Sequence, residues 1–184
     1  MEIRDLGPGG VRILTPARFE DERGFFAETF REEQFAEWNL PAFIQSNHSH
    51  STKNVLRGLH YQLNPESQGK LVQCVAGRIF DVAVDLRRGS PTFGDWVGLT
   101  LGGDEGSMIY VPPGFAHGFC VLSDFADVVY RQSAYYCPEL QRSIRWNDEE
   151  IGILWPVDNP LLSRKDEEAG DLISAEINFV FEES

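Results

Sequence analysis

The sequence predicts an all-β fold, an antiparallel sandwich or jelly roll with a few short helices. Several segments alternate apolar and polar residues with a period of two, which is typical of strands. Turn signals rich in Gly and Pro recur between these segments, at 88–91, 102–104 and 112–114. Many short strands separated in this way indicate a sandwich or jelly roll, and the pattern lacks the helices that a parallel α/β sheet would need.

The expected elements follow one another along the chain. A helix is expected near 32–40, where Phe35 and Trp38 lie three residues apart. Strands are expected at 78–86, 97–101 and 127–132, because apolar residues occupy every second position there. In 78–86 one face carries Phe80, Val82, Val84 and Leu86. The tail at 172–184 alternates over 173–181 and predicts an added edge strand.

The length and net charge of the chain limit the number of domains and the kinds of ligand that it can bind. The chain has 184 residues and a mass of 20.8 kDa, which fits one domain spanning 1–184. A chain of this length buries enough apolar surface to fold without disulfide or metal staples. The net charge of −13 argues against a nucleic-acid partner. A phosphate-bearing ligand would need a local cluster of Arg and Lys in so acidic a chain.

The sequence also predicts a compartment. No run approaches the ~20 apolar residues of a membrane span, and residues 1–5 lack the apolar stretch of a signal peptide. Cys74, Cys120 and Cys137 have no paired spacing, and the first two lie in apolar, strand-like runs. We therefore expect reduced thiols, a cytoplasmic location and no membrane partner.

Two features bear on metal binding. The segment 106–117, GSMIYVPPGFAH, resembles the second conserved motif of the cupin jelly rolls. The first cupin motif would end at Gly77, which places its metal-binding carboxylate on Lys70 and its two histidines near 63–66. Because an ammonium cannot coordinate a metal, no metal site is expected. His48 and His50 form an HxH pair with no carboxylate at ligand spacing after it, and we interpret both as loop residues.

Cationic and aromatic residues suggest another use for the barrel: Arg57, His60, Lys70, His117 and Tyr130. Soluble cores do not bury Arg and Lys without an anion, so this cluster favours an anionic ligand. Arg57 and His60 stand at odd spacing and share a wall only if Gly58 bends or bulges the strand. His60 is either a general base, whose ordinary pKa near ~6.5 suits proton abstraction, or a core histidine bonded to a backbone carbonyl.

Nine longer motifs follow one another along the chain: DERGFF (21–26), QSNHS (45–49), NVLRGLHYQ (54–62), QGKLV (68–72), FDVAVD (80–85), SPTFG (90–94), PPGFAHGF (112–119), IRWND (144–148) and LSRKD (162–166). In their sequence and order they resemble the dTDP-4-dehydrorhamnose 3,5-epimerase family, from about Val11 to Asp166. The resemblance implies a cupin-type antiparallel jelly roll, a dTDP-sugar substrate, and no metal or other cofactor.

The same resemblance implies residue roles. His60 removes the proton beside the sugar ketone, Asp166 orients His60, Tyr130 returns a proton on the opposite face, and Lys70 lies beside the keto oxygen. The family's contacts to the sugar nucleotide fall on Arg23, Glu28, Gln45, Ser46, Asn47, Arg57, Lys70, His117, Gln141 and Lys165. Phe26 and Tyr136 are the expected platforms for thymine. The chemistry fits, because a ketone acidifies its neighbouring C–H bonds and an ammonium stabilises the enolate.

Some points depart from the family or stay open. Gln141 stands where members often have Glu, and Glu139, two residues earlier, could take that contact. The family forms homodimers in which N-terminal strands, here about 1–50, cross to the partner, so that Arg23 and Phe26 would serve the neighbour's site. The alternatives are a mono-epimerase acting at carbon 3 or 5, a 3,4-ketoisomerase, a metal-dependent cupin oxygenase, and a non-catalytic sugar-nucleotide binder.

Overall fold

The computed structural model describes residues 1–182 and contains one large antiparallel sheet and one separate hairpin. The nine strands of the large sheet within this range are β1 (Glu2–Asp5), β2 (Arg12–Thr15), β5 (Gln45–Thr52), β6 (Leu56–Gln62), β7 (Lys70–Asp85), β8 (Trp96–Gly102), β9 (Met108–Val111), β10 (Phe115–Gln132) and β11 (Gln141–Ser143). The hairpin is β3 (Arg18–Asp21) and β4 (Gly24–Ala27). The short helices are α1 (Glu32–Glu37), α2 (Arg164–Glu167) and the 3₁₀ turns Pro8–Gly10, Pro138–Leu140 and Leu172–Ser174.

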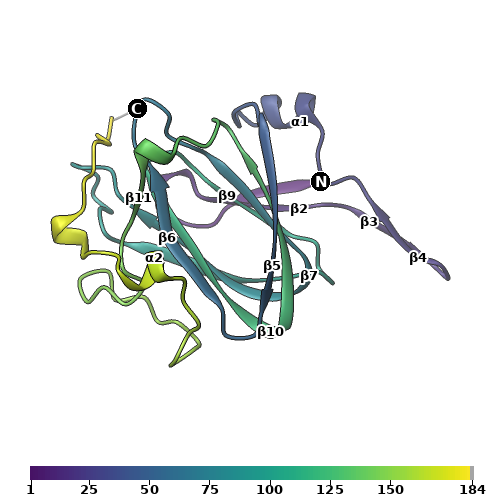
Figure 1. The fold of residues 1–184 in the computed structure, drawn as a ribbon. Coiled ribbons are helices and arrows are strands. Elements are labelled where there is room, and N and C mark those ends of the chain that lie inside the picture. The colour runs from purple at the N-terminus through teal and green to yellow at the C-terminus, as the bar shows by residue number, and fades with distance from the viewer. Residues whose placement is uncertain (183–184) are drawn as a thin grey trace.

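Two long strands, β7 and β10, organise the sheet (Figure 1). These two strands pair with each other along most of their length. On its other edge, each strand pairs with one strand along its first half and with a different strand along its second half. The first half of β10 pairs with β6 and the second with β5, whereas β7 pairs first with β9 and then with β8. The sheet therefore folds over on itself, which confirms the predicted antiparallel jelly roll.

The bend in this strand pair lies at Gly77. Its φ of +78° is a conformation that residues with a side chain rarely adopt. A Cβ at Gly77 would lie 2.0 Å from the carbonyl oxygen of Phe125, so the two backbones approach closely. The register between β7 and β10 also shifts between Val121 and Ala126. This bulged bend lets one strand contribute to two walls of the barrel.

Three apolar clusters form the core of the part of the chain that the structure describes. The first lies between the halves of the folded sheet and includes Val72, Ile79, Leu101 and Phe119. The second lies on the outer face of β6, β7 and β10, beneath the C-terminal segment. The third is covered by α1, whose Phe35 packs there as the sequence predicted.

The strand predicted at 78–86 is confirmed up to Asp85, because β7 spans Lys70–Asp85 and its alternate side chains point to opposite faces. Both of these faces are buried. Val82, Val84 and Leu86 pack outward under the C-terminal segment. On the other face, Ile79 and Ala83 belong to the central core, and Asp81 between them is completely buried. The polar face of this strand thus points into the barrel, where Asp81 becomes available to the site.

The predicted edge strand over 173–181 is wrong. A 3₁₀ turn occupies Leu172–Ser174, and the described part of the tail after it makes a single isolated bridge, Val180 to Arg88. Ile177 and Phe179 are buried in the second cluster. The alternation therefore reflects packing of every second side chain on the sheet rather than a hydrogen-bonded ladder. Residues 183–184 of the predicted tail strand lie outside the described residues.

The assignment of His48 and His50 to a loop is also wrong. Both lie in β5, which pairs with β10 from Gln45 to Thr52. The sequence of β5, QSNHSHST, contains no apolar residue, so it lacks the alternation by which the other strands were predicted. Its inward face is lined with polar side chains because that face borders a cavity rather than the core.

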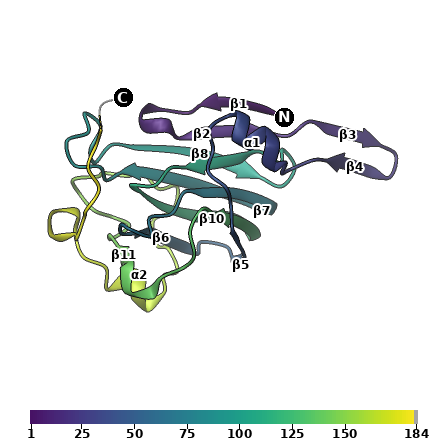
Figure 2. The same ribbon diagram turned by 90° about the horizontal axis from the view of Figure 1, so that it is seen from above.

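The hairpin β3–β4 projects away from the barrel (Figures 1 and 2). It pairs only with itself within the described residues, and its phenylalanines Phe19, Phe25 and Phe26 are 66%, 57% and 71% exposed. Such a row of exposed aromatic rings is unusual on a lone chain.

Candidate active site

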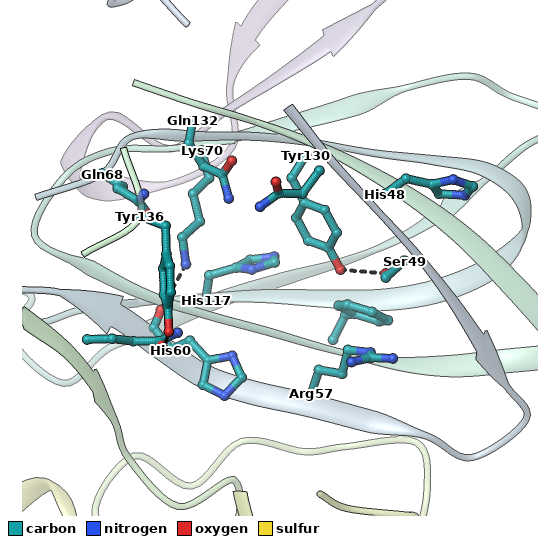
Figure 3. Close-up of a pocket in the computed structure, with 13 residues that line it drawn as sticks. His48, Ser49, Arg57, His60, Gln68, Lys70, His117, Tyr130, Gln132 and Tyr136 are labelled. Atoms are coloured by element: carbon teal, nitrogen blue, oxygen red, sulfur yellow. Dashed lines mark hydrogen bonds between the residues drawn. The ribbon is translucent and has the colours of Figure 1, made fainter. Parts of the chain in front are cut away.

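A cavity of about 270 Å³ opens between the second half of β10, β5 and β6 (Figure 3). Side chains from β5, β6, β7, β10 and β11, and from the segments that precede β7 and β11, line it. The lining residues are Asn47, His48, Ser49, Arg57, His60, Gln68, Lys70, His117, Phe119, Tyr130, Gln132, Tyr136 and Gln141. The structure therefore brings together His60, Lys70 and Tyr130, which the sequence predicted as catalytic, with five further residues predicted to bind substrate.

Arg57 and His60 reach the same cavity because β6 is irregular at Gly58, as the sequence required. Gly58 has a φ of +122°, and a Cβ there would lie 2.6 Å from the Cα of Gly118. The pairing with β10 slips at this point, since His60 faces His117 but Arg57 faces Phe119. Glycine is needed both for the conformation and for the close approach of the two strands.

His60 is held by a buried carboxylate. Its Nε2 lies 2.5 Å from Oδ1 of Asp166, which is 3% exposed. Asp166 sits in α2, whose N-cap Ser163 accepts a hydrogen bond from the Asp166 backbone N–H and donates one to Oδ2. Because Asp166 accepts the Nε2 proton, the lone pair of a neutral ring is left on Nδ1.

The titration of this pair follows from burial and charge. Burial, together with the charges of Lys70 and Lys165, lowers the pKa of His60 below its usual value, although the hydrogen bond and charge of Asp166 raise it. Burial alone would raise the pKa of Asp166, but the hydrogen bonds from His60 and Ser163 lower it below its usual range. At neutral pH the pair is therefore a neutral imidazole beside a carboxylate, the form in which His60 accepts a proton.

Lys70 lies beside the base. It is 9% exposed, and its Nζ donates a hydrogen bond of 3.1 Å to the backbone oxygen of His60 (Figure 3). Burial lowers its pKa to about 8, while the charge of Asp81 raises it. The ammonium is thus still charged at neutral pH, and a negative charge developing in the cavity would find it there.

A second histidine–carboxylate pair forms the floor of the cavity. Nε2 of His117 lies 3.0 Å and 2.9 Å from the two oxygens of Asp81, and both residues are buried. Asp81 comes from the inward face of β7 and His117 from the first half of β10. A buried carboxylate needs a partner of this kind, and here it also counters the buried charge of Lys70.

Tyr130 and Arg57 each contact a serine of β5. The phenol oxygen of Tyr130 lies 3.0 Å from Oγ of Ser49, and Arg57 Nε donates a bond of 3.0 Å to Oγ of Ser51. Burial raises the pKa of Tyr130 to about 12, while the Ser49 hydrogen bond lowers it. The phenol is therefore protonated at neutral pH and able to donate.

The mouth of the cavity is polar and aromatic. Gln141 accepts hydrogen bonds at Oε1 from the Tyr136 hydroxyl, 2.8 Å, and from Lys165 Nζ, 2.7 Å. Gln45 accepts the backbone N–H of Tyr136 and donates to Asn47. Between Gln141 and Glu139, the structure places Gln141 in the cavity wall, whereas Glu139 accepts a contact from the Cys137 thiol.

Four predicted binding residues lie apart from this cavity. Arg23 and Phe26 lie on the β3–β4 hairpin, where Arg23 pairs with Asp21, and Glu28 just after it pairs with Arg31. Ser46 is exposed, and alternation along β5 turns it away from the inward-facing Gln45 and Asn47. A single chain therefore does not join these four residues to the rest of the predicted set.

Sequence reasoning missed five residues that line the cavity, and Asp81, which bonds to His117 beside it. The five lining residues are His48, Ser49, Gln68, Phe119 and Gln132. Gln132 follows Tyr130 by two positions on β10 and so shares its inward face. It is 8% exposed, and its Oε1 has no hydrogen-bond partner among the described residues. Period-two alternation, extended from Tyr130 and from Asn47, is the signal that could have identified Gln132 and Ser49.

The structure also bears on metals and membranes. His48 and His50 both contact Oδ1 of Asp127 across the strand pair, at 2.9 Å and 3.1 Å. Within residues 1–182, no group of three or more His, Cys, Asp or Glu side chains is arranged to hold a metal ion. None of the helices in this part of the chain is long and apolar enough to cross a membrane.

Comparison with known proteins gives consistent matches. The model of the family described as dTDP-4-dehydrorhamnose 3,5-epimerase matches residues 8–173. The dTDP-4-dehydrorhamnose 3,5-epimerase of Shigella flexneri is 56% identical over 158 residues, 85% of this chain and 87% of the relative. The dTDP-4-dehydrorhamnose 3-epimerase of Streptomyces niveus is 40% identical over 171 residues, 92% and 83% of the two chains. A crystal structure of the dTDP-6-deoxy-D-glucose-3,5-epimerase of Legionella pneumophila with dTDP-4-keto-L-rhamnose has a TM-score of 0.91 at 44% identity, covering 94% of each chain.

Proposed function

The chain belongs to the dTDP-4-dehydrorhamnose 3,5-epimerase family, and from this premise we propose that His60 removes the protons beside the sugar ketone and that Tyr130 returns them. The activity is epimerisation of dTDP-4-dehydro-6-deoxy-D-glucose at sugar carbons 3 and 5, a step of dTDP-L-rhamnose biosynthesis. The observation that carries the assignment is the His60–Asp166 pair, which borders the same cavity as Tyr130.

Proton abstraction is the first step. Nδ1 of neutral His60 takes a proton from the carbon next to the ketone, and the electron pair of the C–H bond moves onto the carbonyl oxygen as an enolate. The carboxylate of Asp166 stabilises the imidazolium that forms. The Lys70 ammonium, fixed against the His60 backbone, stabilises the enolate oxygen.

Return of the proton on the other face completes the inversion. His60 extends from β6 and Tyr130 from β10 on the other side of the cavity (Figure 3). The phenol gives its proton to the carbon, and the phenolate is then reprotonated as His60 releases the abstracted proton to solvent. No step of this scheme draws on a metal or a redox cofactor.

The cationic and polar residues around this centre would bind the dTDP portion. Arg57 is the proposed diphosphate ligand, because a guanidinium matches phosphate oxygens in charge and geometry. At the mouth, Tyr136 is the proposed thymine platform, with Gln141 and Lys165 beside it. His117, Gln45 and Asn47 complete the polar lining.

We further propose a homodimer in which the β3–β4 hairpin reaches the partner's cavity. This places Arg23, Phe26 and Glu28 at a site that they do not reach within their own chain. Two observations support it. The hairpin exposes three phenylalanines, and the groove beside it buries guanidinium nitrogens of Arg18 and Arg131 that have no hydrogen-bond partner among residues 1–182. Buried donors of this kind need an acceptor, which a second copy would supply.

A cytoplasmic location is part of the proposal. Cys74, Cys120 and Cys137 are all free, and the first two are buried. Burial raises the pKa of both buried thiols to about 11, so they stay protonated and unreactive. Three unpaired cysteines fit a reducing compartment.

The function is tested by following deuterium incorporation. The protein is incubated with dTDP-4-dehydro-6-deoxy-D-glucose in heavy water, and NMR follows the hydrogens at the two carbons beside the ketone. Exchange at both carbons with inversion is the expected result. Exchange at one carbon would identify a mono-epimerase, and no exchange would leave a sugar-nucleotide binder.

A further inference from the structure

Ser49 has no role in the scheme above, although its side chain points into the cavity. We propose that Ser49 is a positioning residue for the acid: its hydroxyl donates a hydrogen bond to the phenol oxygen of Tyr130 and thereby keeps the phenol proton directed at the sugar. This inference rests on the proposed role of Tyr130 as the acid.

The geometry comes from the pairing of β5 with β10. Ser49 lies opposite Val128 in the register, one diagonal step from Tyr130, and its Oγ reaches the phenol oxygen at 3.0 Å. Figure 3 shows this contact at the end of the cavity near Arg57. The hydrogen bond to Tyr130 is the one that the described residues provide for Ser49 Oγ.

The proposed chemistry determines which of the two hydroxyl groups, that of Ser49 or that of Tyr130, donates the hydrogen bond between them. An acid that gives its proton to a sugar carbon must turn its O–H toward that carbon, so its lone pairs face the protein. The Ser49 hydroxyl is placed to donate to those lone pairs. Its bond becomes charge-assisted once the proton has left and the phenolate has formed, so it stabilises the product of proton transfer more than the resting phenol.

Other groups around Tyr130 do not replace this bond. The charged and titratable side chains that act on it are Arg57 from β6, Asp81 and Cys74 from β7, and the ring of His117 from β10 at 6.4 Å. Arg57 already donates its Nε to Ser51, and the Nε2 of His117 is bonded to Asp81. Ser49 therefore provides the direct hydrogen bond, and the other groups act through charge alone.

Ser51 offers a matched control two residues along the same strand face. It is 4% exposed and contacts Arg57 instead of Tyr130. Ser49→Ala and Ser51→Ala delete the same hydroxyl from the same strand. We expect the first to change proton return and the second to change dTDP binding.

The experiment measures inversion and solvent exchange separately by NMR in heavy water. In Ser49→Ala we expect inversion to slow by on the order of tenfold, with exchange through His60 within about twofold of the parent rate. Ser49→Thr restores the hydroxyl and should recover inversion. Ser51→Ala should weaken dTDP binding and leave the ratio of inversion to exchange unchanged.

A second measurement reports on the phenol itself. With 3-fluorotyrosine incorporated at position 130, the fluorine NMR shift follows the ionisation of that one side chain. The midpoint should rise when Ser49 is replaced by Ala, because the hydrogen bond that favours the phenolate is gone. It should not rise in Ser51→Ala.

Several outcomes would overturn the inference. Inversion at the parent rate in Ser49→Ala, an equal loss of exchange and inversion, or an unmoved fluorotyrosine midpoint would each reduce Ser49 to a structural residue. Tyr130→Phe separates a failure of the acid assignment from a failure of the role proposed for Ser49. If that variant inverts normally, the acid assignment itself fails, whereas a slow Tyr130→Phe with a normal Ser49→Ala rejects only the role of Ser49.

Discussion

Replacing Asp166 with asparagine keeps the shape of the side chain and removes its charge. The carboxylate is 3% exposed and bonded to His60 at 2.5 Å, so solvent screens it little. A hydrogen bond to a charged group contributes about 1.5–3 kcal/mol, and about 1.36 kcal/mol corresponds to a factor of ten in rate. We therefore expect kcat to fall by about 100-fold, near the upper end of that interval, because the imidazolium loses its counter-charge.

The same change should move the pH dependence. Asp166 raises the pKa of His60 against the larger effect of burial. Without that charge the pKa of His60 falls further, so the acidic limb of the kcat profile should shift to lower pH. The base is then available over a wider range but is weaker, and the plateau rate is lower.

The assay is epimerisation with NMR detection in heavy water, in Asp166→Asn and in a control. Asp171→Asn is the matched control, because Asp171 forms a surface ion pair with Arg145 in which both side chains are nearly half exposed. Exchange and inversion should fall together in Asp166→Asn and stay normal in Asp171→Asn. A near-native rate in Asp166→Asn, with His60→Ala inactive, would refute the orienting role of the carboxylate.

Four further predictions follow from the same site. In Tyr130→Phe, deuterium should still enter the sugar while inverted product forms far more slowly, and in His60→Ala exchange and inversion should both collapse; normal exchange in His60→Ala would remove it as the base. Arg57→Ala should weaken dTDP binding by about 2 kcal/mol or more in calorimetry, with thymidine binding unchanged; equal loss of both ligands would make Arg57 structural. Activity should decline as pH rises through about 8, where Lys70 loses its charge, and this decline should move to higher pH in Lys70→Arg. If the decline stayed at the same pH in Lys70→Arg, a group other than Lys70 would be responsible for it. Chelator treatment should leave turnover intact, since Lys70 occupies the ligand position and no cluster of ligands exists within residues 1–182; loss of turnover with a bound metal would contradict this.

The fold could be predicted where burial controls the sequence. In β7 the side chains that pack outward under the C-terminal segment are apolar at every second position, and in β8 those that pack toward the central core are apolar, so both strands are visible in the sequence. β5 was missed because its inward side chains border the cavity and its outward ones are exposed. The tail over 173–181 shows the reverse case, since Ile177 and Phe179 are buried by packing without a strand ladder.

The site could be predicted only as far as the motifs reach. His60, Lys70 and Asp166 lie in motifs quoted from the sequence, whereas Tyr130 lies between motifs, in the strand predicted at 127–132. His60, Lys70 and Tyr130 line the cavity, and Asp166 bonds to His60. Gln132 follows Tyr130 by two positions and so could have been identified by alternation, but only the folded sheet shows that the end of β10 reaches the same cavity. The hairpin residues Arg23 and Phe26 lie outside the cavity of their own chain, and local periodicity in the sequence does not show where in the fold a hairpin is placed.

The divided pairing of β10 has a consequence for how new reactions arise on this scaffold. Its first half holds His117 opposite the strand of the base, and its second half carries Tyr130 opposite β5, with an irregular stretch at 121–126 between them. One residue inserted there would turn the second half over and replace the phenol in the cavity by a neighbour such as Val129 or Arg131, while the base end kept its register. On the roles proposed for His60 and Tyr130, proton return would then change while proton removal is kept. The divided pairing thus allows the two steps to evolve independently on this scaffold.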